Sequence, residues 1–280
     1  MPHMKIIDAH QHFWKYNSKE FDWITDDMSV IRKDFLPEDL FPILQKNNAE
    51  GCVTVQVNQT EKENELFLSY AEKYDFIKGI VGWVDLMAAD IEDKLAYWHQ
   101  HKKLKGFRHI LQGEKDRALM LHSSFKNGIS LLKKFDLSYD ILIYPDQLKY
   151  ALELASFFPG QKFVIDHLAK PYIRSGNIQQ WKKDIQAFKT LENVYCKMSG
   201  MVTEADWNNH SSETFKPYLD IVSETFGTKR IMFGSDWPVC LVASSYKNVL
   251  KIVQDYFSLY SADEQNNIFR NNAIEFYDLR

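Results

Sequence analysis

Two histidines one residue apart follow an apolar stretch close to the start of the chain. Residues 6–14 read Ile-Ile-Asp-Ala-His-Gln-His-Phe-Trp, which places His10 and His12 at the end of a predicted strand. Successive side chains of a strand point to opposite faces, so these two histidines point to the same side. Burying two imidazoles is costly unless a metal, a carboxylate or a substrate binds them. A pair of hydrogen-bonded core histidines explains these two residues equally well.

Further polar residues stand at the ends of later apolar stretches. They are Gln56, Arg108, His109, His167, Lys197 and Asp236. Each has a structural explanation by itself: Arg108 as a surface cation, Lys197 as a side chain extending out of the fold, Asp236 as a loop anchor. If the strand ends meet on one face, however, all of these residues converge with the two histidines in one pocket. We regard that convergence as the better explanation.

The residue types indicate hydrolysis by an activated water. A carboxylate among imidazoles can take a proton from water, which makes Asp236 the candidate general base. Neighbouring histidines and cations can polarise a carbonyl and hold the resulting oxyanion. Arg108 and Lys197 suit an oxygen-rich or acidic substrate. The chain has no Gly-x-Ser-x-Gly sequence, so Ser199 and Ser235 are weak nucleophile candidates.

Three tryptophans near the strand ends could cover the apolar face of a ring, although packing in a core is the commoner role of tryptophan. They are Trp14, Trp207 and Trp237. The side chains most suited to contact a substrate are therefore Arg108, His109, Lys197, Gln56, Trp14 and Trp237.

The elements that position these residues alternate along the chain. Strands are predicted from residue 6 to the two histidines and at 51–57, 77–84, 104–110, 138–144, 163–167, 194–200 and 230–238. Helices are predicted at 36–47, 61–74, 91–100, 125–135, 147–158, 181–190, 215–226, 249–260 and 263–277. Such alternation implies parallel pairing. Eight strand–helix units predict an α/β fold, a (β/α)8 TIM barrel that forms a single domain over residues 1–280. An open doubly wound sheet would need a glycine-rich phosphate loop after the first strand, where none is found.

Composition excludes several classes of partner. The chain has 280 residues with 45% hydrophobic residues, 26% charged residues and a net charge of -4, which favours neither nucleic acid nor an anionic membrane as partner. No apolar run approaches ~20 residues and no signal peptide is recognised, so we expect no membrane span. Three widely spaced cysteines, Cys52, Cys196 and Cys240, form no disulfide or zinc-finger pattern, which favours a reducing cytoplasm.

Longer blocks of sequence carry a family resemblance. They cover residues 8–14, 81–85, 106–109, 166–171, 197–200 and 232–240. With His-x-His on the first strand, a histidine on the sixth and an aspartate on the eighth, the chain resembles the amidohydrolase superfamily, in particular its sugar-lactonase branch of the L-fuconolactonase and L-rhamnonolactonase type. The resemblance implies a barrel that opens a lactone ring to a hydroxy acid, with Asp236 activating water and His10, His12 and His167 around it.

The chain departs from the family pattern in the residues that would bind a metal. Binuclear members carry a bridging Lys or Glu on the fourth or fifth strand and a histidine on the fifth. Here the fifth strand ends in Ile-Tyr-Pro at 143–145, and the fourth ends in Arg108 and His109. We therefore expect no binuclear centre. A single zinc or manganese ion on His10, His12 and Asp236, with or without His167, and a site that requires no metal both remain open.

Two other functions are compatible with these residues. Related barrels with His-x-His and an aspartate act as metal-dependent decarboxylases, and the same fold could serve as a non-catalytic protein that binds sugar acids. Barrels host many reactions, so the fold alone does not choose among the three functions.

Overall fold

The computed structural model describes residues 4–279 and contains a parallel sheet of eight strands. The strands are β1 (Ile6–Gln11), β2 (Ala49–Val55), β3 (Ile77–Gly82), β4 (Leu104–His109), β5 (Ser138–Ile141), β6 (Phe163–Ile165), β7 (Val194–Met198) and β8 (Ile231–Phe233). They pair in chain order from β1 to β8. The two edges meet beyond the last strand, where the His12 N–H donates to the Trp237 carbonyl at 2.7 Å and the Asp236 N–H to the His10 carbonyl at 2.8 Å. The sheet is thus a nearly closed barrel.

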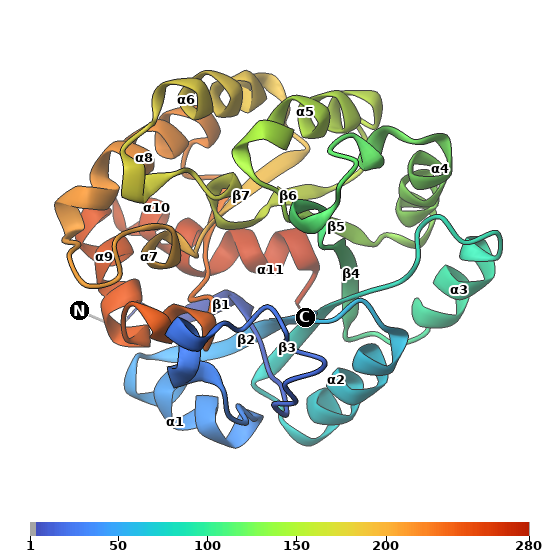
Figure 1. The fold of residues 1–280 in the computed structure, drawn as a ribbon, viewed down its shortest axis with the longest axis horizontal. Helices are drawn as coiled ribbons and strands as arrows, with labels where there is room; N and C mark the ends of the chain where they lie inside the picture. The colour runs from blue at the N-terminus through green and yellow to red at the C-terminus, as the bar shows by residue number, and fades with distance from the viewer. Residues whose placement is uncertain (1–3, 280) are drawn as a thin grey trace.

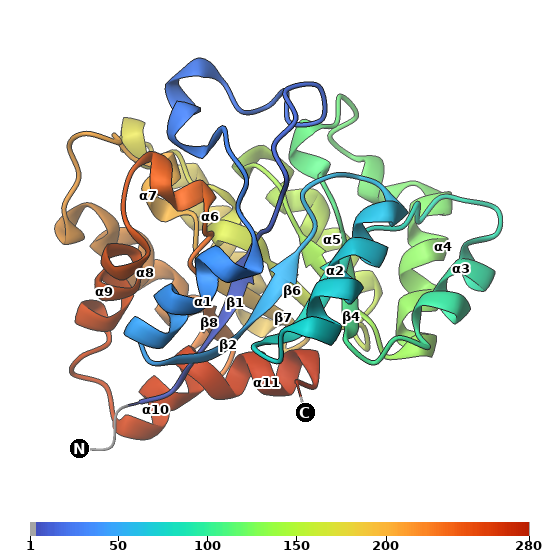
Figure 2. The ribbon, with the colours of Figure 1, turned by 90° about the horizontal axis from the view of Figure 1, so that it is seen from below.

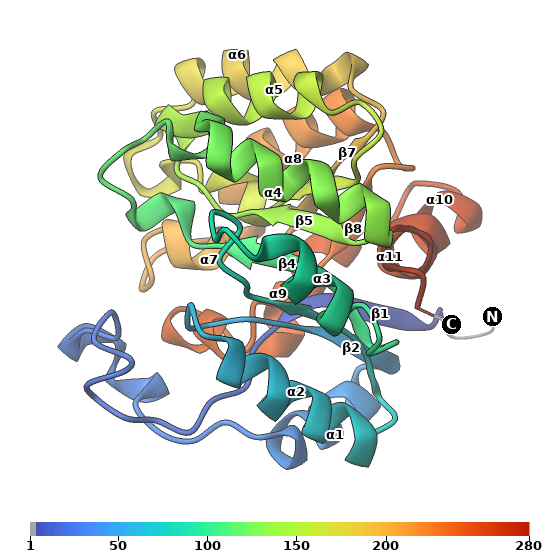
Figure 3. The same cartoon turned by 90° about the vertical axis from the view of Figure 1, so that its right-hand side faces the viewer.

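Helices surround this barrel (Figure 1). They are α1 (Pro37–Lys46), α2 (Glu61–Lys73), α3 (Ile91–Trp98), α4 (Ser123–Leu132), α5 (Leu148–Phe157), α6 (Gln179–Gln186), α7 (Met201–Glu204), α8 (Ser212–Phe226), α9 (Tyr246–Tyr256), α10 (Ala262–Asn266) and α11 (Asn272–Tyr277). Figure 3 shows α2, α3, α4 and α5 in succession across one outer side. The predicted (β/α)8 TIM barrel is confirmed.

Some boundaries differ from the prediction. We expected strands to 167 and 238, but β6 ends at Ile165 and β8 at Phe233. In both cases the chain turns into left-handed backbone shortly after the strand end, at His167 and at Asp236. The single helix expected at 263–277 is instead α10 and α11 joined by a wider π-helical turn.

Apolar residues form one layer inside the barrel and another between strands and helices. The inner cluster includes Ile7, Val53 and Val164, and α11 adds Phe276 and Tyr277 to it. Figure 2 shows α11 beneath the end where β1 begins, opposite the loop that follows β1. This helix therefore covers one end of the barrel and leaves the carboxyl ends of the strands as the mouth. Within the described chain, no helix combines the length and the apolar character needed to cross a membrane.

A β-bulge in β1 directs the two histidines into the barrel. Ala9 packs in the inner cluster, so strict alternation would turn His10 outward. Between Asp8 and Gln11 the pairing advances three residues on β1 but only from Cys52 to Thr54 on β2. The extra residue leaves Gln11 on the outer face, where its amide donates to Thr54 Oγ1 at 2.7 Å. His10 and His12 consequently both face the interior, a common use of bulges beside functional sites.

Candidate functional site

Three imidazoles surround one carboxylate at the mouth of the barrel. Asp236 Oδ1 lies 3.3 Å from His12 Nε2, 4.0 Å from His10 Nε2 and 3.9 Å from His167 Nε2. All four side chains are buried. His10 lies in β1, and the other three lie in the segments that follow β1, β6 and β8. The structure thus brings together the four residues for which the sequence predicts a catalytic role.

Left-handed backbone holds His167 and Asp236 in place. His167, Leu168, Ala169 and Lys170 have φ values of 53°, 55°, 58° and 50°, and Asp236 has φ 58°. Each such non-glycine residue costs roughly 1–2 kcal/mol. The turn is fixed by a bond from the Lys170 N–H to the His167 carbonyl at 2.7 Å and by the 2.8 Å contact between His167 Nδ1 and Ser199 Oγ. Strain of this kind is typical of functional sites.

Gly200 makes room for the His167 ring. Its φ is +64°, and a Cβ at this position would lie 2.6 Å from His167 Nδ1. We expect Gly200→Ala to lower the free energy of unfolding by about 2–5 kcal/mol and to reduce any activity of the site, because the methyl group strains the left-handed backbone and the ring must move. Gly176 has φ +68°, and no neighbouring atom would lie within 4 Å of a Cβ added there, so Gly176→Ala should lose only about 1 kcal/mol. Equal losses in urea unfolding for both variants would contradict this role of Gly200.

A layer of buried charges lies beneath His10. Lys197 Nζ is 2.5 Å from Asp140 Oδ2, 3.1 Å from Asp166 Oδ1 and 3.1 Å from His10 Nδ1. The Tyr277 hydroxyl, from α11, donates to Asp140 Oδ2 at 2.8 Å. Lys197 is fully buried. Its side chain therefore links the strands below the mouth, and its expected contact with substrate stays a prediction.

Arg108 connects this layer with the mouth. Its Nη1 donates to Asp166 Oδ2 at 3.0 Å and lies 3.3 Å from His10 Nε2. Its Nη2 donates to Gln56 Oε1 at 3.2 Å, and the Gln56 amide donates to the Arg108 carbonyl at 3.3 Å. Arg108 and Gln56 thus form the wall of the site beside His10.

Three other predicted substrate-binding side chains contact protein groups away from Asp236. His109 points to the opposite face of β4 from Arg108, and its Nε2 lies 2.8 Å from Glu114 Oε1. The Trp14 indole donates to the Lys33 carbonyl at 2.9 Å. Trp237 packs edge-on against Phe13 and Phe35.

Burial and neighbouring charges determine the protonation of the site. Burial lowers the pKa of His167 to about 4, and burial lowers that of His10 well below its usual value. Burial opposes ionisation of Asp236, but His167 and a hydrogen bond with His12 outweigh it and hold the Asp236 pKa below its usual value. Near neutral pH the site therefore combines an ionised carboxylate with neutral His10 and His167.

This protonation predicts a loss of stability in mild acid. The pKa of His167 is about 4 in the fold against 6.5 for the free side chain, so the unfolded chain binds its proton first as pH falls. Stability should decline between about pH 6.5 and 4, by about 3 kcal/mol from His167. Urea unfolding at pH 7, 5.5 and 4 measures this slope. A His167→Gln variant with an unchanged slope would disprove the assignment.

The donor atoms fit a single divalent ion. The Nε2 atoms of His10 and His12 lie 3.2 Å apart, close to the spacing of about 3.3 Å between neighbouring ligands of tetrahedral zinc. His12 Nδ1 faces the Val55 carbonyl at 2.8 Å, and a proton on Nδ1 would leave the Nε2 lone pair free for an ion. His10, His12 and Asp236 form one possible ligand set, and His10, Asp166 and His167 form another. The nearby Arg108 guanidinium competes with a cation for His10 Nε2.

Comparison with known proteins identifies the family. A family model described as amidohydrolase matches residues 7–279. The chain belongs to the amidohydrolase family. The resemblance inferred from the sequence blocks is therefore confirmed.

Several members of the amidohydrolase family match nearly the whole chain. L-fucono-1,5-lactonase of Burkholderia multivorans is 34% identical, over 98% of this chain and 96% of the relative. L-fucono-1,5-lactonase of Burkholderia ambifaria is 32% identical, over 97% of this chain and 94% of the relative. A crystal structure of an amidohydrolase from Burkholderia multivorans with bound zinc has a TM-score of 0.95 and 34% identity, covering 98% of this chain and 99% of that one.

The predicted site omitted the buried partners of Lys197. Asp140 and Asp166 were not among the predicted site residues, although Asp140 is a lone carboxylate within the apolar fifth strand and Asp166 directly precedes His167. These positions in the sequence could have indicated that both carboxylates belong to the site. No feature of the sequence indicated Tyr277, because it lies in the last helix and enters the barrel only through the path of α11.

Proposed function

We propose that this chain hydrolyses a sugar aldonolactone, such as L-fuconolactone or a related L-sugar lactone, to the sugar acid. The observation that carries the proposal is the convergence of His10, His12 and His167 on Asp236, in a chain 34% identical to an L-fucono-1,5-lactonase. The proposal places this reaction in the cytoplasm, in sugar breakdown. The three buried free cysteines support a reducing compartment.

In the proposed reaction, Asp236 takes a proton from a water whose oxygen adds to the lactone carbonyl carbon. The resulting oxyanion is stabilised by Arg108 and the neighbouring imidazoles. The bond from the carbonyl carbon to the ring oxygen then breaks, and the ring oxygen receives the proton held by Asp236. The products are a carboxylate and a free hydroxyl on one open chain, with a net release of one proton to solvent.

Replacing Arg108 should affect the transition state. We expect Arg108→Ala to lower kcat/KM by roughly 10²–10³, the usual cost of losing one oxyanion donor. Arg108→Lys keeps the charge but loses the paired contacts with Asp166 and Gln56, so its activity should be intermediate. Initial rates with a lactone measure both variants. Unchanged kinetics in Arg108→Ala would place this residue outside the reaction.

A divalent ion, when bound by His10, His12 and Asp236, would act as a Lewis acid toward the substrate carbonyl. The crystal structure of the related Burkholderia multivorans amidohydrolase contains bound zinc, which supports zinc as the ion. A lactone is an activated ester, so the same residues could also work without a metal. Turnover that survives chelation would support the metal-free site. Turnover lost on chelation and restored by zinc or manganese would assign the three residues as ligands.

The proposal is tested with a panel of five- and six-membered aldonolactones, including L-fucono-, L-rhamnono-, D-arabinono- and L-galactonolactone. Proton release is followed with an indicator and corrected for spontaneous opening. Fast turnover of one or more lactones supports the proposal. Carbon dioxide release from a carboxylated substrate with a required metal would support the decarboxylase instead. Binding of sugar acids with no turnover of any lactone would support a binding protein.

A further inference from the structure

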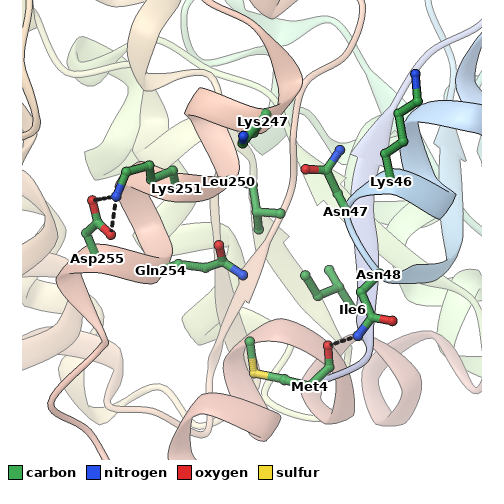
Figure 4. A pocket seen from close by; sticks show the side chains of 10 residues that line it. All are labelled: Met4, Ile6, Lys46, Asn47, Asn48, Lys247, Leu250, Lys251, Gln254 and Asp255. Atoms are coloured by element: carbon green, nitrogen blue, oxygen red, sulfur yellow. Dashed lines mark hydrogen bonds and ion pairs between the residues drawn. The ribbon is translucent and has the colours of Figure 1, made fainter. Parts of the chain in front are cut away.

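A cavity of about 560 Å³ lies between the loop after β6 and the short helix α7. Both segments follow strand carboxyl ends, so the cavity opens on the mouth side of the barrel. The cavity drawn in Figure 4 differs, because it lies at the opposite end, between the start of β1, the end of α1 and α9. The cavity by α7 is lined by Tyr172, Arg174, Ser175, Thr203, Glu204 and Trp207.

An ion pair beside this cavity joins the turn after β6 to α7. Lys170 Nζ is 3.6 Å from Glu204 Oε1, and the two side chains are 18% and 20% exposed. Burial raises the pKa of Glu204, and the positive charge of Lys170 opposes that rise. The Lys170 N–H donates to the His167 carbonyl at 2.7 Å, and His167 Nε2 lies 3.9 Å from Asp236 Oδ1, so the ion pair borders the turn that places His167 beside Asp236.

The side chains around the cavity have the chemistry that binds polyols. A carboxylate accepts hydrogen bonds from hydroxyl groups, and an ammonium donates to hydroxyl oxygens. Trp207 offers an aromatic face, and its indole N–H donates to the Thr203 carbonyl at 2.9 Å, which fixes the ring. By contrast, the Gln56 and Lys197 side chains are fully buried, whereas those of Lys170 and Glu204 are partly exposed.

We propose that this cavity is the subsite for the hydroxyl-bearing part of the substrate. Glu204 and Lys170 bond the hydroxyl groups, and Trp207 covers the apolar face of the ring or chain. The lactone carbonyl then lies on the Asp236 side of the ion pair. This inference rests on the proposed lactone hydrolysis and assigns its specificity to Glu204, Lys170 and Trp207.

The test compares two six-membered lactones that differ in their hydroxyl groups. L-fucono-1,5-lactone carries them and δ-valerolactone does not. In Glu204→Gln and Trp207→Ala, the ratio of kcat/KM for the sugar lactone to that for δ-valerolactone should fall at least tenfold, mainly through KM. The exposed residue Glu213 on α8 supplies the control Glu213→Gln, whose ratio should stay within twofold. An unchanged ratio in both cavity variants would overturn the proposal.

Binding of the product acid separates this inference from the proposed function. Calorimetry with L-fuconate requires no turnover. We expect Glu204→Gln to weaken this binding at least tenfold and Glu213→Gln to leave it unchanged. If no lactone is hydrolysed but L-fuconate binding depends on Glu204, the subsite stands and the hydrolytic function fails. If Glu204→Gln binds L-fuconate as the wild type does, the subsite is wrong.

Discussion

Replacing Asp236 with asparagine should lower kcat for lactone hydrolysis by about 10²–10⁴, the usual contribution of a general base. The amide cannot take the proton of the attacking water. The fold should persist, because asparagine has nearly the same volume and tolerates the left-handed backbone that Asp236 adopts at φ 58°. The change is therefore confined to the chemistry at one carboxyl group.

A matched surface variant controls for unspecific effects. Asp93 is exposed on α3, and Asp93→Asn should hydrolyse lactones at the wild-type rate. Circular dichroism and urea unfolding should show all three proteins equally folded. If Asp236→Asn kept near-normal kcat while folded, another group would have to be the base.

Removing Lys197 should have the largest effect on stability. We expect Lys197→Met to lower the free energy of unfolding by about 3–5 kcal/mol, since it leaves buried carboxylates without their shared cation. Asp140 and Asp166 are both fully buried, at 2.5 and 3.1 Å from Lys197 Nζ. Urea unfolding at neutral pH measures the loss.

Two further variants show whether burial causes this effect. Lys251 and Asp255 form an exposed ion pair on α9, so Lys251→Met should lose less than about 1 kcal/mol. The double variant Lys197→Met/Asp140→Asn should regain part of the lost stability, because it removes one uncompensated charge. A stable Lys197→Met protein with a raised KM would instead show that Lys197 binds substrate.

The overall fold can be predicted from patterns that are visible in a single sequence. Eight apolar stretches alternate with amphipathic ones, and parallel pairing with helical crossovers then leaves few architectures. The residues at the strand ends converge for the same reason. This is why His10, His12, His167 and Asp236 could be predicted to lie together before their geometry was known.

The direction of an individual side chain cannot always be predicted from the alternation of faces along a strand. The bulge in β1 turns His10 inward although Ala9 also faces the interior. His109 points away from the site because adjacent residues of a strand point to opposite faces, and its neighbour Arg108 points into the site. Lys197 could equally have extended out of the barrel, but two buried carboxylates hold it below the mouth.

Lactone hydrolysis is tested most directly by following L-fucono-1,5-lactone by NMR with the purified protein. We expect the lactone signals to disappear at a rate proportional to enzyme concentration, with one equivalent of sugar acid formed. Wild type and Asp93→Asn should act alike, whereas Asp236→Asn should be close to the spontaneous rate. Loss of the lactone at the buffer rate with every protein, repeated across the lactone panel, would show that this chain does not hydrolyse sugar lactones.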